Sequence, residues 1–465
     1  MKNSRVLPPP ARSALSSRGI TGYLRRRARL IILLVSVLAG HDVLPAATLT
    51  ATYFGFDTNA ADNYSAMQRL GNYASTNRSV SVAFAPGRYM ITMSSARMAA
   101  CLIAGATNVL IDAPAAEFFS TNLNTEGYCV FAFISCTNVT LNARFRGLHS
   151  SGDSSRDGLT SVLLLASNNT ARLNVTTLRM FDGVRIGGLE DPAFVSRPVY
   201  EGNRNITVTA TNVDTYYGVP AYLADGLTIT NVSVGTSSNG FCAHRSVYLI
   251  GCTNALAYSY SRDLNVPDGC NIIGTTPAVV PPYHFGSSNI TLYATDLGST
   301  NNALYQSLVK LQVVTSSVTN ISTGIKRIRI HVTAPSTATV RTNSFTVDIG
   351  SLGSQAAHRY EDITISGTVA RGPFSTAPTM VIDTADGGLA YLQITLADYH
   401  ETVAPSRYTF YDYSPLSTVM NITAEDSDVN GFYFPVPADQ TFQNLGYLPP
   451  PLPASDVHVI GATLP

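Results

Sequence analysis

Four Asp-Gly pairs, each at the start of an apolar run, have the residue types and the spacing that catalysis could use. They are Asp157, Asp182, Asp225 and Asp268, at intervals of 25, 43 and 43 residues. If the pairs recur on stacked coils, about 4.8 Å apart, their carboxylates would form a line along one face. Two carboxyl groups about 5–9.5 Å apart can hydrolyse a glycosidic bond. We therefore predict Asp182, Asp225 and Asp268 as catalytic residues and Asp157 as a substrate-binding residue.

The same pairs also fit ordinary turns, because Gly accepts positive φ angles and Asp hydrogen-bonds to its own backbone. Two Pro-rich stretches favour the catalytic interpretation. They occupy residues 187–203 and 274–288, directly after Asp182 and Asp268, and they interrupt the regular pattern of the chain. Loops at these places would form the walls of a cleft.

Cationic and aromatic residues in the same part of the chain extend the candidate site. In a β-eliminating lyase a base removes the proton beside a uronate carboxyl, and a cation or Ca²⁺ neutralises that carboxyl. His244 and Arg262 have the types for such catalytic roles, and each also fits an ordinary surface position. The further substrate-binding candidates are Arg245, Asp263, Tyr283, His284 and Tyr200. We predict no metal ligands and no cofactor, and Ca²⁺ is implied only if the reaction is an elimination.

Short strands are the elements that must position these residues. The phrases TNVTL (137–141), NITVTAT (205–211), LTITNVSV (227–234) and NITLYAT (289–295) share a β-branched alternation beside an Asn. Related phrases recur at intervals of roughly 20 to 45 residues, which predicts a solenoid of single strands. The aromatic alternation AYSYS at 257–261 directly precedes Arg262.

One helix is predicted in residues 62–73, where apolar residues recur at helical spacing. These residues are Ala66, Met67, Leu70 and Tyr73. Together with Phe54-Gly55 before it and APGRY at 85–89 after it, the segment resembles the opening of pectin-lyase-like right-handed β-helix proteins. The resemblance implies an all-β, single-stranded right-handed parallel β-helix with a short N-terminal capping helix. The catalytic motifs of polygalacturonase-like hydrolases and of pectate lyases are not intact, so no catalytic residue is carried over from them.

The first 47 residues differ from the rest of the chain. They hold eight basic residues against one acidic residue, and the apolar run LIILLVSVLAG follows at 30–40. This order predicts a secretory signal peptide; an N-terminal membrane anchor is the alternative, for which the apolar run is short. Removal of residues 1–47 leaves a net charge of −7, which argues against nucleic acid as a partner.

We predict residues 48–435 as the β-helix domain and residues 436–465 as a C-terminal tail. Six cysteines match no zinc-binding pattern; Cys129 and Cys136 fit either a disulfide across one turn or inward-facing thiols. The predicted function is that of a secreted protein that binds and cleaves a polysaccharide, with hydrolysis favoured over elimination. No membrane partner is expected after signal cleavage. A non-catalytic β-helix adhesin or surface structural protein is the alternative.

Overall fold

The computed structural model describes the chain in segments. They are residues 47–92, 99–121, 128–148, 159–187, 202–236, 245–264, 266–275, 286–298, 305–314, 324–334, 345–352, 358–370, 379–383, 390–402, 410–412, 418–425, 427, 432–433 and 455–460. All of them belong to one unit, Ala47–Pro465. The predicted signal or anchor lies outside the described residues.

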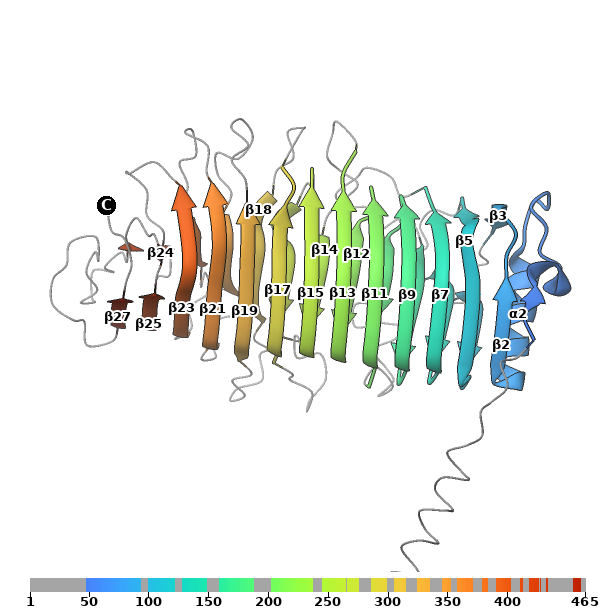
Figure 1. The fold of residues 1–465 in the computed structure, drawn as a ribbon, viewed down its shortest axis with the longest axis horizontal. Helices are drawn as coiled ribbons and strands as arrows, with labels where there is room; N and C mark the ends of the chain where they lie inside the picture. Colours follow the sequence, from blue (N-terminus) through green and yellow to red (C-terminus); the bar gives the residue numbers. More distant parts are fainter. Residues whose placement is uncertain are drawn as a thin grey trace, which may run out of the picture. The chain divides into compact units, whose positions relative to one another are not determined.

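Two parallel sheets make up this unit, and the chain alternates between them strand by strand (Figure 1). Sheet A has 15 described strands. They are β1 (Leu49–Thr50), β2 (Ser79–Ala83), β5 (Asn108–Ser120), β7 (Thr137–Arg146), β9 (Asn169–Leu178), β11 (Arg204–Val213), β13 (Asp225–Val234), β15 (Thr253–Arg262), β17 (Ser288–Asp296), β19 (Ile325–Ala334), β21 (His358–Ala370), β23 (Ala390–Thr402), β25 (Thr418–Glu425), β27 (Ser455–Ile460) and β3 (Gly87–Ile91), which pairs with β5.

Sheet B has 12 described strands. They are β4 (Ala99–Ala104), β6 (Cys129–Ile134), β8 (Thr160–Ala166), β10 (Asp182–Ile186), β12 (Tyr217–Tyr222), β14 (Arg245–Ile250), β16 (Val266–Gly274), β18 (Tyr305–Val314), β20 (Phe345–Leu352), β22 (Met380–Asp383), β24 (Phe410–Asp412) and β26 (Phe432–Tyr433). Each strand pairs with the strand one coil away, so the chain is a parallel β-solenoid, as the repeat predicts. β27 lies within the predicted tail and pairs with β25, so sheet A extends past residue 435.

The predicted capping helix is present as α2 (Tyr64–Asn77), which follows the short 3-10 helix η1 (Ala51–Phe54). Its apolar face buries Ala66, Met67 and Leu70 and packs on β4. At Gly71 a Cβ atom would lie 2.6 Å from the carbonyl oxygen of Leu102, so glycine permits this close approach. The helix therefore covers apolar core at the first coil, where a solenoid would otherwise expose it.

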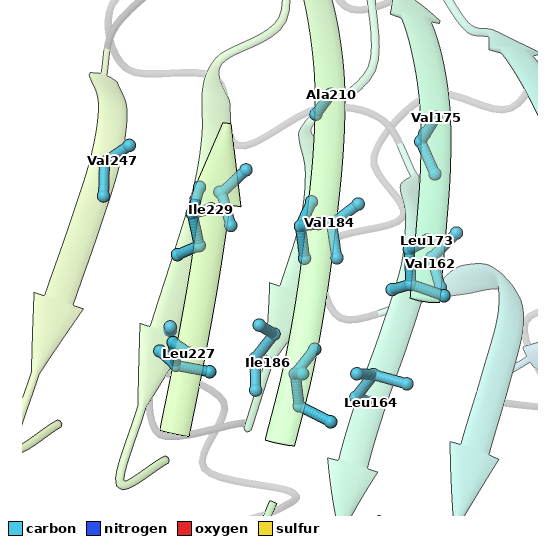
Figure 2. Packing of buried hydrophobic residues seen from close by; sticks show 14 of the residues in the cluster. Val162, Leu164, Leu173, Val175, Val184, Ile186, Ala210, Leu227, Ile229 and Val247 are labelled. Carbon is cyan, nitrogen blue, oxygen red and sulfur yellow. The ribbon is translucent and has the colours of Figure 1, made fainter. Parts of the chain in front are cut away.

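The core lies between the two sheets. Inward side chains alternate with outward ones along the strands of sheet A, and Figure 2 shows Leu173, Ile229 and Ala210 of that sheet with Val162 and Ile186 of sheet B. β-Branched and other aliphatic residues fit this pleated, buried surface well. Stacked aliphatic rows therefore hold successive coils together through burial of apolar area.

The recurrent Asn of the sequence phrases has a backbone role. Asn138, Asn205, Asn254 and Asn289 each occupy the second position of a sheet A strand, with φ between 53° and 56°. Asn tolerates this left-handed conformation better than most residues. Its side chain also bridges coils: Asn138 Nδ2 donates to Asn108 Oδ1 at 2.8 Å, and Asn289 Nδ2 donates to Asn254 Oδ1 at 2.6 Å. The Asn of the phrase thus marks the bend that begins these four strands.

A second recurrent position faces inward at the turn from sheet B to sheet A, and we call it the turn column. Four of its members donate a side-chain hydrogen bond to a carbonyl near the end of the sheet B strand one coil before. Cys136 Sγ donates to Ile103 O at 3.4 Å, Asn168 Nδ2 to Phe133 O at 3.0 Å, Asn203 Nδ2 to Leu164 O at 3.0 Å, and Cys252 Sγ to Ala221 O at 3.4 Å. The fifth member, Ser287, donates from Oγ to Gly274 O in the sheet B strand of its own coil at 2.6 Å. All five cysteines in the described segments are buried thiols outside any disulfide, so Cys129 and Cys136 form no disulfide with each other; Cys242 lies outside those segments. Within the same segments, no helix is long and apolar enough to cross a membrane.

Candidate functional site

The predicted single row of Asp-Gly carboxylates is wrong. Asp182 begins β10 in sheet B, Asp225 begins β13 in sheet A, and Asp268 lies in β16 of sheet B. The intervals in sequence misled because the coils differ in length: the connection from β10 to β11 spans residues 187–203, whereas two residues join β12 to β13. Equal intervals in sequence between two Asp-Gly pairs therefore do not place the two pairs in the same sheet.

Asp225 makes the contacts of a structural turn residue. Its Oδ1 accepts hydrogen bonds from Thr253 Oγ1 at 2.9 Å and from Asn254 Nδ2 at 2.6 Å, and Gly226 has a φ of 70°. The bonds from Asn254 and Thr253 hold the pKa of the Asp225 carboxyl below its ordinary value. A general acid near neutral pH requires the opposite shift. These contacts favour the turn interpretation of Asp225.

Asp182 is held differently. Its carboxylate is fully buried, and Oδ2 accepts hydrogen bonds from Thr160 Oγ1 and from Arg185 Nε, both at 2.7 Å. The following Gly183 is not in the left-handed region. Instead, a Cβ atom there would collide with Asn212 Oδ1 and with the Gly218 carbonyl oxygen. Glycine is thus required after each Asp for a different reason: Gly226 adopts a left-handed turn, whereas Gly183 has no space for a Cβ atom.

Asp182 belongs to a polar row on the side of sheet B that faces away from the core. Arg185 alternates with the core residues Val184 and Ile186, and Tyr248 alternates with Val247 and Leu249. We call the following set the outer face of sheet B: Asp182, Arg185, Tyr217, Tyr222, Arg245, Tyr248, Lys310 and Asp348. In register, Asp182 pairs with Tyr217 and Tyr217 pairs with Arg245 on the next coil.

Arg245 lies at the middle of this face. Its Cζ is 5.3 Å from the centroid of the Tyr217 ring and 4.9 Å from that of Tyr248, and the two rings are nearly parallel at an interplanar angle of 13°. Arg245 Nη1 also lies 3.5 Å from the Tyr217 hydroxyl. Arg245 and Tyr248 are half-buried, whereas Tyr217 is buried. Cation–π attraction to both rings therefore fixes the guanidinium where one part of it reaches solvent.

Two buried ion pairs flank Arg245 along the sheet. On one side Arg185 pairs with Asp182, and its Cζ lies 5.8 Å from the Tyr222 ring centroid. On the other side Lys310 Nζ is 3.2 Å from Asp348 Oδ2, with side-chain exposures of 12% and 0%. Charges buried to this degree lose much hydration and tolerate burial only when they are well paired. Clusters of this kind occur often at functional sites.

The carboxylates of this face are too far apart to act as a hydrolytic pair. β10 and β20 are five strand spacings apart, so Asp182 and Asp348 are separated by about 24 Å. The strands that contain Asp182 and Asp268, β10 and β16, are three spacings apart, or about 14 Å. Both separations exceed the range of about 5–9.5 Å for glycosidases.

The other predicted residues divide between sheet A and segments outside the description. Arg262 ends β15 with an exposed side chain, and Asp263 follows at a turn with a φ of 53°. Both therefore lie away from the outer face of sheet B; of the predicted residues whose side chains are described, Arg245 and Asp182 lie on that face. Asp157, Tyr200, His244, Tyr283 and His284 lie outside the described residues, and only the backbone of Asp268 is described.

Sequence reasoning missed Arg185, Tyr217, Tyr248, Lys310 and Asp348. A signal was available in the short strands DGVRI at 182–186, YGVPAY at 217–222 and RSVYLI at 245–250. In each, a charged or aromatic residue interrupts an otherwise apolar run. Within the part of the chain that the structure describes, no group of three or more His, Cys, Asp or Glu side chains could hold a metal ion.

Known proteins offer similarity of fold at low identity. No protein-family model and no curated protein matches the chain. Among solved structures, the Agl-KA catalytic domain is 13% identical with a TM-score of 0.40, covering 82% of this chain and 69% of that one. The A-module of the Azotobacter vinelandii mannuronan C-5 epimerase AlgE6 is 10% identical with a TM-score of 0.29, covering 90% and 99%. The Streptococcus pneumoniae surface protein and adhesin PfbA is 10% identical with a TM-score of 0.36, covering 90% and 97%. Function must therefore be argued from the residues themselves.

Proposed function

We propose that this chain binds an acidic polysaccharide along the outer face of sheet B. The observation that carries the proposal is Arg245, held against the rings of Tyr217 and Tyr248 with Arg185 and Lys310 farther along the same sheet. A guanidinium binds a carboxylate through two parallel hydrogen bonds, and tyrosine offers both a ring and a hydroxyl to a sugar. Arg245 is the half-buried cation that would bind a carboxylate of the polymer, whereas Arg185 and Lys310 are held in buried ion pairs with Asp182 and Asp348.

β-Elimination is the reaction that we propose for this site, in preference to hydrolysis. Arg245 Nη1 and Tyr217 OH are 3.5 Å apart, so a uronate carboxylate bound by Arg245 would lie near the phenol. The bound guanidinium would neutralise the carboxylate, and the phenolate of Tyr217 would accept the proton from the adjacent carbon. The electron pair of that C–H bond would form the new double bond as the bond from carbon to the glycosidic oxygen breaks, and the leaving oxygen would take up the proton from the Tyr217 phenol. This assignment rests on the Arg–Tyr pair and on the wide separation of the carboxylates.

We also propose that the chain acts outside the cell, because residues 1–47 have the charge and apolar order of an export signal. N-terminal sequencing of the protein recovered from its native host should begin after residue 40. An intact N-terminus in a soluble, active protein would contradict export by cleavage.

Binding of alginate, polygalacturonate and neutral dextran, measured by isothermal titration calorimetry, tests the proposal. We expect an acidic polymer to bind and the affinity to fall with added salt. Arg245→Ala should weaken that binding at least tenfold, and Arg262→Ala, which removes an exposed arginine of sheet A, is the matched control. Absorbance of unsaturated products would show elimination, whereas reducing ends without that absorbance would show hydrolysis. Absence of binding to both acidic polymers would favour the non-catalytic adhesin or structural protein.

A further inference from the structure

The outer face of sheet A carries a strip of stacked aromatic side chains that the proposed function does not use. Tyr258, Tyr293 and His331 are register partners on the successive strands β15, β17 and β19. The rings of Tyr258 and Tyr293 are 4.9 Å apart with an interplanar angle of 10°, and the ring of His331 lies 5.5 Å from Tyr293 at 51°. We call these three residues the aromatic strip. Tyr258 comes from the alternation AYSYS at 257–261.

The aromatic strip is accessible. Tyr293 is 37% exposed, and Tyr258 and His331 are half-buried. The strip is directed away from the core, because Tyr258 alternates with Ala257 and Tyr293 alternates with Leu292, both of which are core residues. The core separates this face from the outer face of sheet B, so the two surfaces can bind ligands independently. Exposed aromatic groups on a soluble protein often mark an interaction site.

Hydroxyl groups surround the strip, and acidic groups do not. The outward residues of the flanking columns on β13 to β21 are Thr228, Val232, Leu256, Tyr260, Thr291, Thr295, Arg329, Thr333, Thr364 and Thr368. Arg329 Nη1 donates to Thr364 Oγ1 at 2.9 Å, and His331 Nδ1 lies 3.1 Å from Ser366 Oγ, so both basic side chains already have neutral partners. A ligand of this surface would meet rings and hydroxyls far more than charge.

Among the described residues, the aromatic stack ends at Tyr258. Thr230 is the register partner that precedes Tyr258, and it is much smaller than a tyrosine. Among the described residues, Tyr293 is the aromatic partner of Tyr258. The other face of the Tyr258 ring is therefore available to the C–H groups of a sugar ring, which carry partial positive charge and are attracted to the negative face of the π-system. Thr228 and Thr230 would lie beside that sugar as hydrogen-bond partners.

We infer that the aromatic strip is a second carbohydrate-binding surface, and that its ligand is a neutral polysaccharide laid across the strands of sheet A. A flat surface that repeats at the coil spacing, about 4.8 Å, suits a repeating polymer better than the irregular surface of a globular protein. This inference goes beyond the acidic-polysaccharide site on sheet B and does not depend on it.

Affinity electrophoresis in gels that contain a β-glucan, a galactomannan or dextran tests the inference on the full chain. We expect at least one of these neutral polymers to retard the wild type. Tyr293→Ala and Tyr258→Ala should each weaken that retardation at least tenfold, whereas Thr176→Ala, an exposed outward substitution on β9 of the same sheet, should leave it within twofold. Arg245→Ala should not change it, which separates this surface from the site on sheet B.

Three results would overturn the inference. The first is that none of the three neutral polymers retards the wild type. The second is that Tyr293→Ala, shown to be folded by an unchanged thermal transition, binds them as the wild type does. The third is that Tyr293→Ala changes the sedimentation coefficient or abolishes binding of a single-stranded oligonucleotide, since the strip would then serve self-association or nucleic-acid binding.

Discussion

The first coils and the central coils of this solenoid share one backbone pattern but differ in what they enclose. The first coils enclose phenylalanines: Phe118 packs edge-on against Phe131 at 5.3 Å and stacks on Phe145 at 5.6 Å between ring centroids. The central coils enclose amides and hydroxyls at inward positions, among them Asn212, Asn231 and Ser246, all buried. The same contrast holds on the outer side of sheet B, where Cys129, Ala132 and Leu163 give way to charges and tyrosines.

The polar interior of the central coils is a connected network. Thr177 Oγ1 donates to Asn212 Oδ1 at 2.5 Å, Asn212 Nδ2 donates to Asn231 Oδ1 at 2.6 Å, and Asn231 Nδ2 donates to Ser246 Oγ at 2.8 Å. Ser246 and Ser259 hydroxyls are 2.7 Å apart. This network lies behind Gly183 and Gly218, in the strands that present Asp182 and Tyr217. The difference teaches that apolar burial stabilises the first coils, whereas directional bonds fix the backbone beneath the candidate site.

The largest expected effect is in the first coils. Phe131→Ala removes a fully buried ring from the aromatic cluster, and it should lower the free energy of unfolding by about 4 kcal/mol. Denaturant titration followed by far-ultraviolet circular dichroism measures the change. Phe119→Ala is the matched control, since Phe119 is half-buried on the outer side of sheet A, and its effect should be smaller. Equal effects would show that the interior of these coils is not the dominant source of stability.

A somewhat smaller effect is expected from the ion pair of the central coils. Arg185→Met leaves the carboxylate of Asp182 buried without its guanidinium, which should cost about 3 kcal/mol. The double variant Asp182→Asn with Arg185→Met should recover much of this loss, because it removes the buried charge as well. Arg172→Met, at an exposed position of β9, should change the free energy of unfolding little. If the double variant were no more stable than Arg185→Met, a buried uncompensated charge would not be the cause.

A substitution in the internal hydrogen-bond network should lower the free energy of unfolding less than either of the two preceding substitutions. Asn231→Ala removes the acceptor of Asn212 and the donor to Ser246, and two unsatisfied buried groups should cost about 2 kcal/mol. Thermal and denaturant unfolding give the value, with Asn174→Ala on the exposed face of β9 as the control. We also expect Asn231→Ala to weaken binding of the acidic polymer while Phe131→Ala leaves it unchanged at a temperature where both are folded. Equal binding in both variants would contradict the assignment of the network to the candidate site.

The smallest effect concerns Asp225 and depends on pH. Its pKa is lower in the folded chain than the ordinary value, so its contribution to stability is present above about pH 4 and is lost as the pH falls through the folded pKa. Asp225→Asn should therefore be slightly less stable than the wild type at pH 7 and should show a shallower loss on acidification. Unfolding midpoints between pH 7 and pH 3 measure this. Parallel pH profiles would show that Asp225 does not contribute.

The solenoid could be predicted from the sequence because its cause is local. Alternation of β-branched residues recurs in coils of different length, with Asn at the bend of four sheet A strands, and the helix spacing of residues 62–73 is likewise contained in one segment. The candidate site could not be predicted in the same way. Which sheet receives Asp182 or Asp225 depends on the lengths of all the connections before it, and one partner of Asp182, Thr160, comes from the preceding coil. The dipeptide Asp-Gly, moreover, occurs both where glycine adopts a left-handed turn, at Gly226, and where there is no space for a Cβ atom, at Gly183.

The turn column has a consequence for the chemical reactivity of the chain. Burial raises the pKa of the Cys252 thiol to about 12 and also raises that of Cys136, and only the thiolate reacts readily with disulfide or maleimide reagents. Each thiol should therefore not react with these reagents while its turn stays folded. Cys136 lies in the phenylalanine-filled coils and Cys252 in the polar ones. The rate at which a thiol reagent modifies each cysteine should therefore report how often its own region opens.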